Sequence, residues 1–167
     1  MGSTKLAKLG AGIAALLLGA LVFLAWRFSP TDSAGPCVVT GGPLMFPELP
    51  EASGLAIGRR DPAILWSQND SGNAAVLFAV HTAGTVRGRV RVPIRARDWE
   101  DVSAARCSSG PCLYLADIGD NGRVRQRIYI YRLPEPEPAQ GETAPPEVFS
   151  ATYADGPHNA EAMFVLD

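Results

Sequence analysis

The strongest constraint on the fold of this chain is an internal repeat of about fifty residues. The stretch Leu65–Asn73 can be superimposed on Leu113–Asn121, at an offset of 48 residues (113 − 65). Both combine an apolar and aromatic run with a polar turn that ends in Asn. Farther along, Leu77–Val80 matches Ile128–Tyr131 at an offset of 51 residues (128 − 77). Such self-similarity indicates that one supersecondary unit is used more than once.

The repeated unit is built of strands. Short apolar runs alternate with clusters of Gly, Asn, Asp and Pro, and little 3.6-residue apolar spacing is sustained after the N-terminal segment. Equivalent units start at Ser53, Glu100 and Glu161, and the longer second interval contains a proline-rich acidic insertion, 133–146, which we expect to be a surface loop. About four short strands in fifty residues are typical of one blade of a β-propeller.

The available length sets the number of blades. Residues 37–167 amount to 131 (167 − 36), whereas four blades of roughly 45 residues need about 180. We therefore predict an all-β fold that is a partial β-propeller, with about two blades plus the first strand of a third at Met163–Asp167. This would be the N-terminal part of a longer propeller, in which residues 37–50 help to close the last blade. A complete sandwich of 131 residues is the alternative.

A segment of 18 residues without charge, Leu9–Trp26, precedes this domain. As a helix it would reach roughly 27 Å, close to the ~30 Å hydrocarbon core of a bilayer. Lys5 and Lys8 favour a cytoplasmic N-terminus. We expect residues 1–36 to be a cytoplasmic tip, single-pass inner-membrane anchor and short linker, with residues 37–167 in the periplasm or outside the cell. A cleaved signal peptide and a buried helix of a soluble protein are the alternatives.

The cysteines agree with export. Cys107 and Cys112 flank a four-residue turn, and a hairpin can bring such ends within bonding distance, so we predict a disulfide. A metal pair is the alternative, but metal sites of this kind use a second pair elsewhere in the chain. Cys37 is then the third cysteine, left over from this pair, and the sequence does not identify its partner.

Acidic and amide side chains recur at equivalent positions of the repeat. Loops of one class gather on one face of a propeller, so these side chains from different blades are expected to converge. Oxygen ligands of this kind suit Ca²⁺. We predict metal ligands at Asn69, Asp70, Asp117, Asp120 and Asn121, and binding residues at Asp98, Glu100, Asp101, His158, Asn159 and Glu161. The alternative is that Asn, Asp and Gly here only shape tight turns.

Five motifs in residues 50–167 carry a resemblance. They are Glu51-Ala-Ser-Gly-Leu-Ala, Asn69-Asp-Ser-Gly, Arg97-Asp-Trp-Glu-Asp101, Leu115-Ala-Asp-Ile-Gly-Asp-Asn121 and His158-Asn-Ala-Glu-Ala162. Together they resemble a family of exported bacterial β-propeller proteins of mostly unassigned function, loosely similar to phytase-like propellers. The resemblance implies a fold and export, and no reaction follows from it, because one fold supports many chemistries.

Composition and missing motifs narrow the function. A net charge of −2 with 19% charged residues excludes a disordered or strongly basic nucleic-acid-binding protein. Standard hydrolase, phosphate-loop and dinucleotide-binding signatures do not occur in the sequence. We expect a membrane-tethered module that binds an extracytoplasmic ligand or protein, with Ca²⁺ as the expected ion and with no catalytic residue assigned. A metal-dependent phosphoesterase similar to propeller phytases is the alternative.

Overall fold

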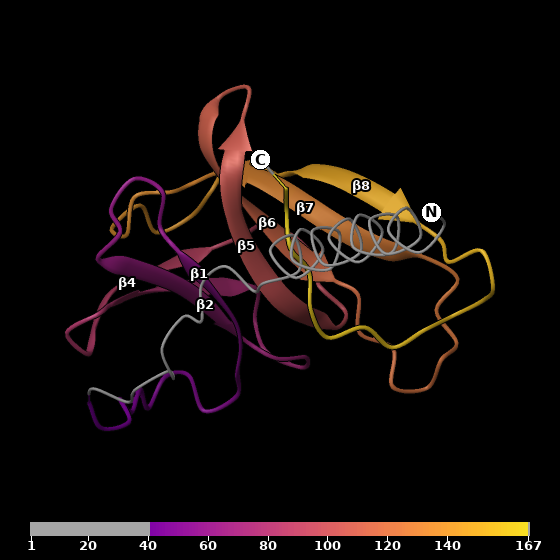
Figure 1. Cartoon of the computed structure of the whole chain (residues 1–167), viewed down its shortest axis with the longest axis horizontal. Helices are drawn as coiled ribbons and strands as arrows, with labels where there is room; N and C mark the ends of the chain where they lie inside the picture. Colours follow the sequence, from indigo (N-terminus) through magenta and orange to yellow (C-terminus); the bar gives the residue numbers. More distant parts are fainter. Residues whose placement is uncertain (1–40, 167) are drawn as a thin grey trace, which may run out of the picture. The chain divides into compact units, whose positions relative to one another are not determined.

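The computed structural model describes residues 41–166, and its regular structure there is entirely β (Figure 1). The first sheet contains β1 (Ala52–Ile57), β2 (Ile64–Asn69), β3 (Val76–His81) and β4 (Thr85–Arg91). The second contains β5 (Trp99–Cys107), β6 (Gly110–Asp117), β7 (Ile128–Pro134) and β8 (Glu147–Ala151). Both sheets are antiparallel and follow chain order, which confirms the all-β prediction.

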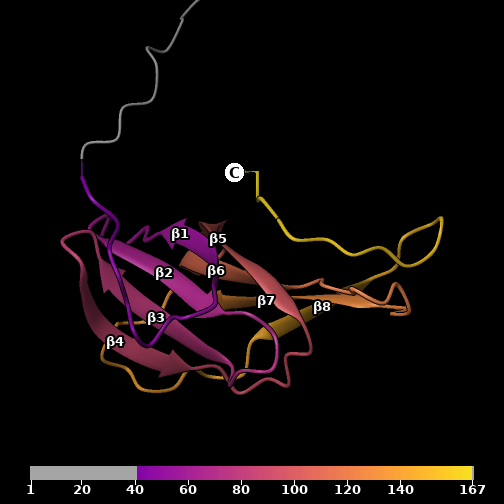
Figure 2. The same cartoon turned by 90° about the horizontal axis from the view of Figure 1, so that it is seen from below.

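The sequence repeat is a repeat of these sheets. Leu65 and Leu113 lie in the second strand of their sheets, and Leu77 and Ile128 each lie in the third. Figure 2 shows the sheets packed beside each other, with β1 near β5. Within residues 41–166 no helix is long and apolar enough to cross a bilayer, and the predicted anchor, Leu9–Trp26, lies outside the described residues together with Cys37.

The core lies between the two sheets and is centred on aromatic side chains. Trp66 and Trp99 are each only 1% exposed and pack with Leu77, Leu113 and other apolar residues of both sheets. Each indole N–H has a partner, since Trp66 Nε1 donates to a Glu135 carboxylate oxygen at 3.0 Å and Trp99 Nε1 donates to a backbone carbonyl at 2.7 Å. Buried aromatic rings of this size dominate core energetics when their polar atom is satisfied.

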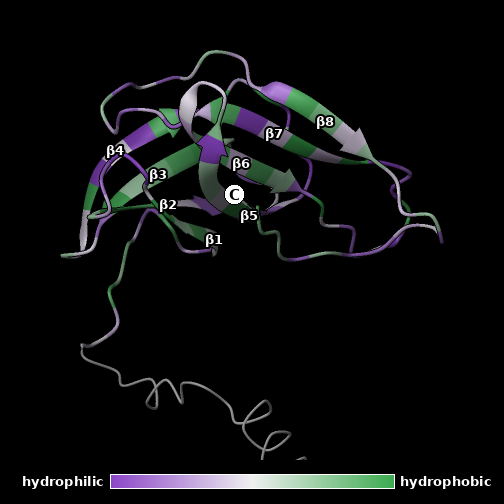
Figure 3. Cartoon of the chain, turned by 45° about the horizontal axis from the view of Figure 1, so that its top comes forward, coloured by the Kyte–Doolittle hydropathy of each residue, from purple (hydrophilic) through white to green (hydrophobic). Residues whose placement is uncertain are grey.

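The outer faces of the sheets are partly covered. On the first sheet, Leu49 packs against Phe78 and Val80. Leu55 and Ile57 of β1 are more than half exposed, as is Val148 of β8. Figure 3 shows the alternation of hydrophilic and hydrophobic residues along β4, β7 and β8, as expected for strands with unlike faces.

The proline-rich insertion between β7 and β8 lies against the edge of the first sheet. The amide of Arg91 donates to the carbonyl of Gly141 at 2.7 Å, and the amide of Thr143 donates to the carbonyl of Arg91 at 2.9 Å. Gly88 is so close to Pro138 that a Cβ atom would lie 1.7 Å from the Pro138 carbonyl oxygen. The expected surface loop therefore also covers the β4 edge, whose unpaired backbone groups would otherwise invite pairing with another chain.

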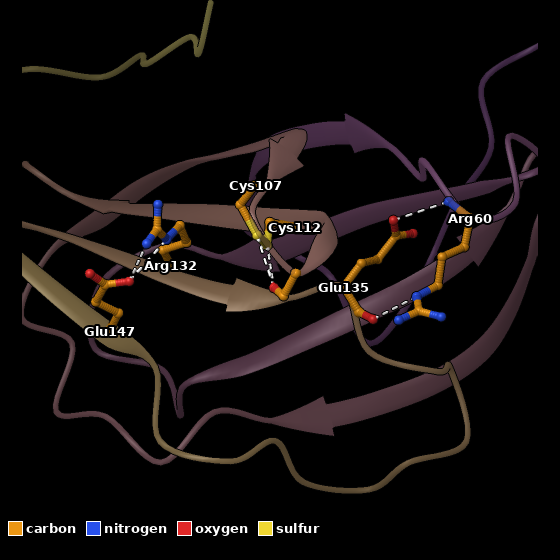
Figure 4. Close-up of a disulfide and its surroundings, with 7 residues drawn as sticks. Arg60, Cys107, Cys112, Arg132, Glu135 and Glu147 are labelled. Atoms are coloured by element: carbon orange, nitrogen blue, oxygen red, sulfur yellow. Dashed lines mark hydrogen bonds and ion pairs between the residues drawn. A yellow bond between two sulfur atoms is a disulfide. The ribbon is translucent and has the colours of Figure 1, made fainter. Parts of the chain in front are cut away.

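Glu135, at the start of this insertion, joins the two sheets. Its carboxylate accepts the backbone amides of Arg59 at 2.9 Å and Arg60 at 3.1 Å, as well as the Trp66 indole. Glu135 is 3% exposed, so these three donors replace its hydration. Figure 4 shows it directed toward Arg60 from the neighbouring segment.

The predicted disulfide is present. Cys107 ends β5 and Cys112 lies in β6, and the bond joins them with their Cα atoms 5.9 Å apart (Figure 4). The turn is tighter than the expected four residues, because Cys107 pairs directly with Gly110 in the ladder. Gly110 has φ of 106°, a conformation that glycine adopts without strain.

The strand expected at Met163–Asp167 is not formed in the described part of this segment, which ends at residue 166. The chain there is held by side chains of β5 instead. The amide of Met163 donates to Asp101 Oδ2 at 2.8 Å, and its carbonyl accepts the Ser103 hydroxyl at 2.9 Å. These bonds occupy backbone groups that a neighbouring strand would otherwise pair, and no such neighbour lies among residues 41–166.

Candidate functional site

Three carboxylates converge where the end of β2 meets the start of β5. Asp70, Asp98 and Glu100 each contribute an oxygen, and the three oxygens lie within 4.8 Å of one another. The junction is fixed by Trp99, which lies between two of these acids in sequence and whose indole donates to the carbonyl of Asn69. The core position of one tryptophan thus brings together acids that are thirty residues apart in sequence (100 − 70).

Glu100 occupies an irregular position in its strand. The ladder between β5 and β6 shifts register between Trp99 and Asp101, so Glu100 lies in a β-bulge. The β1–β2 ladder shifts between Ala52 and Leu55 in the same way. Bulges redirect a side chain and are common beside functional sites.

Burial and like charge act together on Glu100. The residue is 4% exposed, and burial is the largest cause that raises the pKa of its carboxyl to about 7. The charges of Asp70, Glu161 and Asp98 raise this pKa further, in that order, and a hydrogen bond with Glu161 adds to them. Without a cation the group therefore retains a proton at mildly acidic pH.

Gly119 makes room for the acidic group. A Cβ atom on Gly119 would lie 2.2 Å from Glu100 Oε1 and 2.5 Å from Asp98 Oδ2. Its amide donates to the carbonyl of Asp98 at 3.0 Å. The sequence reasoning did not single out Gly119, although the residue lies within the Asp-Ile-Gly-Asp-Asn motif.

A buried amide lies on the same strand as Asp70. Gln68 is fully buried, and neither its Oε1 nor its Nε2 has a hydrogen-bond partner in the described structure. Asp70 continues the strand by donating its amide to the carbonyl of Glu51 at 2.9 Å. A buried unpaired amide is unfavourable, so a water molecule or ion is expected beside it.

Asp117 does not join the acidic group. Its carboxylate pairs with the Arg125 guanidinium at 2.8 Å and accepts the backbone amides of Arg97 at 3.1 Å and Asp98 at 2.9 Å. It is 1% exposed. Asp117 therefore positions the segment that carries Asp98.

Asp120, Asn121 and Asn159 form a second set of contacts. Asn159 accepts the Asp120 amide at 2.5 Å and donates to Asn121 Oδ1 at 3.3 Å and to Glu161 Oε1 at 2.5 Å. Burial alone would raise the pKa of Asp120, but hydrogen bonds from the amides of Arg125 and Val124 and nearby arginine charges hold it below its usual value. This set fastens the C-terminal segment and brings Glu161 toward Glu100.

The remaining predicted residues make other contacts. The Asn69 side chain accepts the Glu51 amide at 3.2 Å and donates to a backbone carbonyl at 2.9 Å. Asp101 accepts the amides of Val102 and Met163, both at 2.8 Å. His158 pairs with the exposed Asp155 at 2.9 Å. The structure thus gathers Asp70, Asp98 and Glu100, with Glu161 beside them.

The size of the acidic group matches one bound cation. Calcium binds oxygen ligands at about 2.3–2.6 Å, so oxygens on opposite sides of one ion lie roughly 5 Å apart. Three carboxylate oxygens within 4.8 Å can therefore contact one ion.

In comparisons with known proteins, no family model, curated protein or solved structure matches this chain.

Proposed function

We propose that this chain is a membrane-tethered, extracytoplasmic module that binds a ligand or partner, with two consecutive β-propeller blades and a Ca²⁺ ion at Asp70, Asp98 and Glu100. The observation that carries the proposal is the convergence of these three carboxylates within 4.8 Å. Their mutual repulsion would be offset by a divalent cation. Glu161, which forms a hydrogen bond with Glu100, offers a further oxygen ligand at this place.

The propeller part of the proposal is supported by contacts that recur between successive units. Gly54 in β1 is so close to β5 that a Cβ atom would lie 2.4 Å from the backbone nitrogen of Val102. One unit later, Ser103 in β5 holds Met163 through a hydrogen bond of 2.9 Å. In the proposed propeller, the segments that begin successive blades would pack in this way around a common axis. The exposed apolar side chains on the outer faces agree with blades that are flanked by further blades.

Export is supported by the disulfide and by the uncharged segment. The Cys107–Cys112 bond persists in oxidising compartments. Leu9–Trp26 is long enough to anchor the chain. Outside the cytoplasm Ca²⁺ sites of modest affinity, with Kd of about 10⁻⁴ to 10⁻³ M, are common.

The test is calcium titration calorimetry on the full chain in a non-ionic detergent after removal of ions with a chelator. We expect one ion per chain with Kd of about 10⁻⁴ to 10⁻³ M. Asp98→Asn should weaken binding at least tenfold, and Glu137→Gln, which alters an exposed acid on the insertion, should leave it unchanged. No heat up to about 10 mM calcium, or equal affinity in Asp98→Asn, would contradict the site.

A phosphatase assay separates the module from the phosphoesterase alternative. The same preparation is incubated with p-nitrophenyl phosphate, with and without calcium. Ion binding without turnover supports the binding module. Turnover that requires calcium and is lost in Asp98→Asn would show that the protein is a metal-dependent phosphoesterase and not a binding module.

A further inference from the structure

A polar pocket, distinct from the acidic group, lies beside the segment that carries Asp98. It has a volume of about 430 Å³, and its walls include four arginines and two tyrosines: Arg95, Arg97, Arg125, Arg127, Tyr129 and Tyr131. The arginines come from the connection between the two sheets and from the connection between β6 and β7. Because these arginines lie in two separate segments of the sequence, the sequence alone did not predict this pocket.

The pocket has an excess of positive charge. Arg125 is 5% exposed and is committed to Asp117 and to the carbonyl of Gly119, to which its Nη1 donates at 2.8 and 2.7 Å. Asp117 is the acid among the residues that line the pocket, and Asp120 interacts with Arg97 through its charge. With four arginines and one acid in its lining, the pocket is positively charged.

Two of the pocket's arginines are available to a ligand. Arg95 and Arg127 are exposed, and neither forms an ion pair with an acid in the described structure. Arg127 Nη1 lies 3.5 Å from the Ser150 hydroxyl, which adds a neutral donor at the rim. Guanidinium groups suit tetrahedral oxyanions because their planar N–H forks can bind two oxygens at once.

The tyrosines form one wall of the pocket. The rings of Tyr129 and Tyr131 stack with their centres 6.4 Å apart and an angle of 21° between planes. Burial and the Asp117 charge raise the pKa of Tyr131 to about 12, so its hydroxyl stays neutral. Tyr131 donates only a long bond, 3.5 Å, to Asp117. The wall is therefore neutral and flat, and does not repel an anion.

We propose that this pocket binds the tetrahedral oxyanion group, phosphate or sulfate, of a small-molecule ligand, held by Arg95, Arg97 and Arg127. Arg125 and Asp117 form its rigid floor, and the tyrosine wall contacts the uncharged part of the ligand. This site is separate from the cation site, because Arg97 lines the pocket whereas Asp98 belongs to the acidic group. Binding of the anion therefore does not depend on calcium.

The test is titration of the full chain in detergent with inorganic phosphate and with sulfate, in the presence of a chelator. Arg95→Gln combined with Arg127→Gln should weaken binding at least tenfold. Arg87→Gln, an exposed arginine of β4 outside this pocket, is the matched control and should bind as the wild type does. Circular dichroism checks that the variants fold, which is expected because both replaced side chains are exposed.

The two anions identify the source of the group. Binding of phosphate alone indicates a phosphate ester as ligand, and binding of sulfate alone indicates a sulfate ester. Equal binding by the double variant, or an equal signal from acetate at the same ionic strength, would overturn the proposal. The result is independent of the calcium titration, since no divalent ion is present.

Discussion

Gly119 lies directly against Glu100, at a distance that leaves no room for a Cβ atom between them. That atom would be 2.2 Å from Glu100 Oε1, and the atoms it meets are the ends of carboxylate side chains, which can move aside. We therefore expect Gly119→Ala to displace Glu100 and Asp98 without unfolding the domain. Calcium affinity should fall at least tenfold, while stability in chelator changes by no more than about 1 kcal/mol.

The control for this variant lies in the same loop. An added Cβ at Gly122 would make only ordinary contacts, 3.7 and 3.9 Å, with Val124. Gly122→Ala should therefore retain the calcium affinity of the wild type. If both alanine variants bind calcium as the wild type does, the acidic group is not the ion site.

The raised pKa of Glu100 predicts how stability depends on pH. Its folded pKa of about 7 lies above the ordinary value of 4.5, so between these values the folded state binds a proton that the unfolded state has released. Stability from this group is fully present below pH 4.5 and is lost as the pH rises through about 7. The lowered pKa values of Asp120 and Asp155 act below 3.8, outside this window.

Urea unfolding in chelator, followed by tryptophan fluorescence between pH 4.5 and 7.5, measures this loss. Glu100→Gln should remove it, because the amide does not titrate and does not repel its neighbours. Glu137→Gln is the control and should keep the wild-type slope. A stability that rises steadily across this range in the wild type would show that Glu100 is not perturbed as described.

The disulfide is expected to affect stability but not ion binding. It closes a short loop, with a sequence separation of five residues, so replacing both cysteines by serine should destabilise the domain by about 2 kcal/mol. The hairpin lies at the far end of β5 from Glu100, so the calcium affinity should not change. Urea unfolding and calcium titration of the double variant measure the two effects. A large loss of affinity would mean that the hairpin orders the whole strand.

The sequence predicted the repeat and the strands because both depend on local pattern. Leu65 and Leu113 hold equivalent strand positions, and the apolar and aromatic runs around them form a strand wherever a neighbour can pair. The disulfide was predictable for the same reason, since it closes within one hairpin. The strand expected at Met163 was not formed because a strand also needs a partner, which pattern alone does not supply.

The candidate site could be predicted from the sequence only in part. Acidic residues at recurring positions pointed to convergence, but the side chain that each acid faces depends on nonlocal packing. Asp117 was expected to be a metal ligand like Asp70, yet Arg125 pairs with it in the core. Gly119 and the arginine pocket could not be found by motif, because their roles arise where separate segments meet.

The buried Asp117–Arg125 pair should be among the most sensitive positions of the domain. Both side chains are almost fully buried, and Asp117→Ala would leave the Arg125 charge without its partner and the amides of Arg97 and Asp98 without an acceptor. We expect a loss of about 3–5 kcal/mol in urea unfolding. The matched control is Glu142→Ala, which removes the exposed pair with Arg91 and should cost less than about 1 kcal/mol. Similar losses in the two variants would mean that the pair at Asp117 is hydrated and does not fix the segment that carries Asp98.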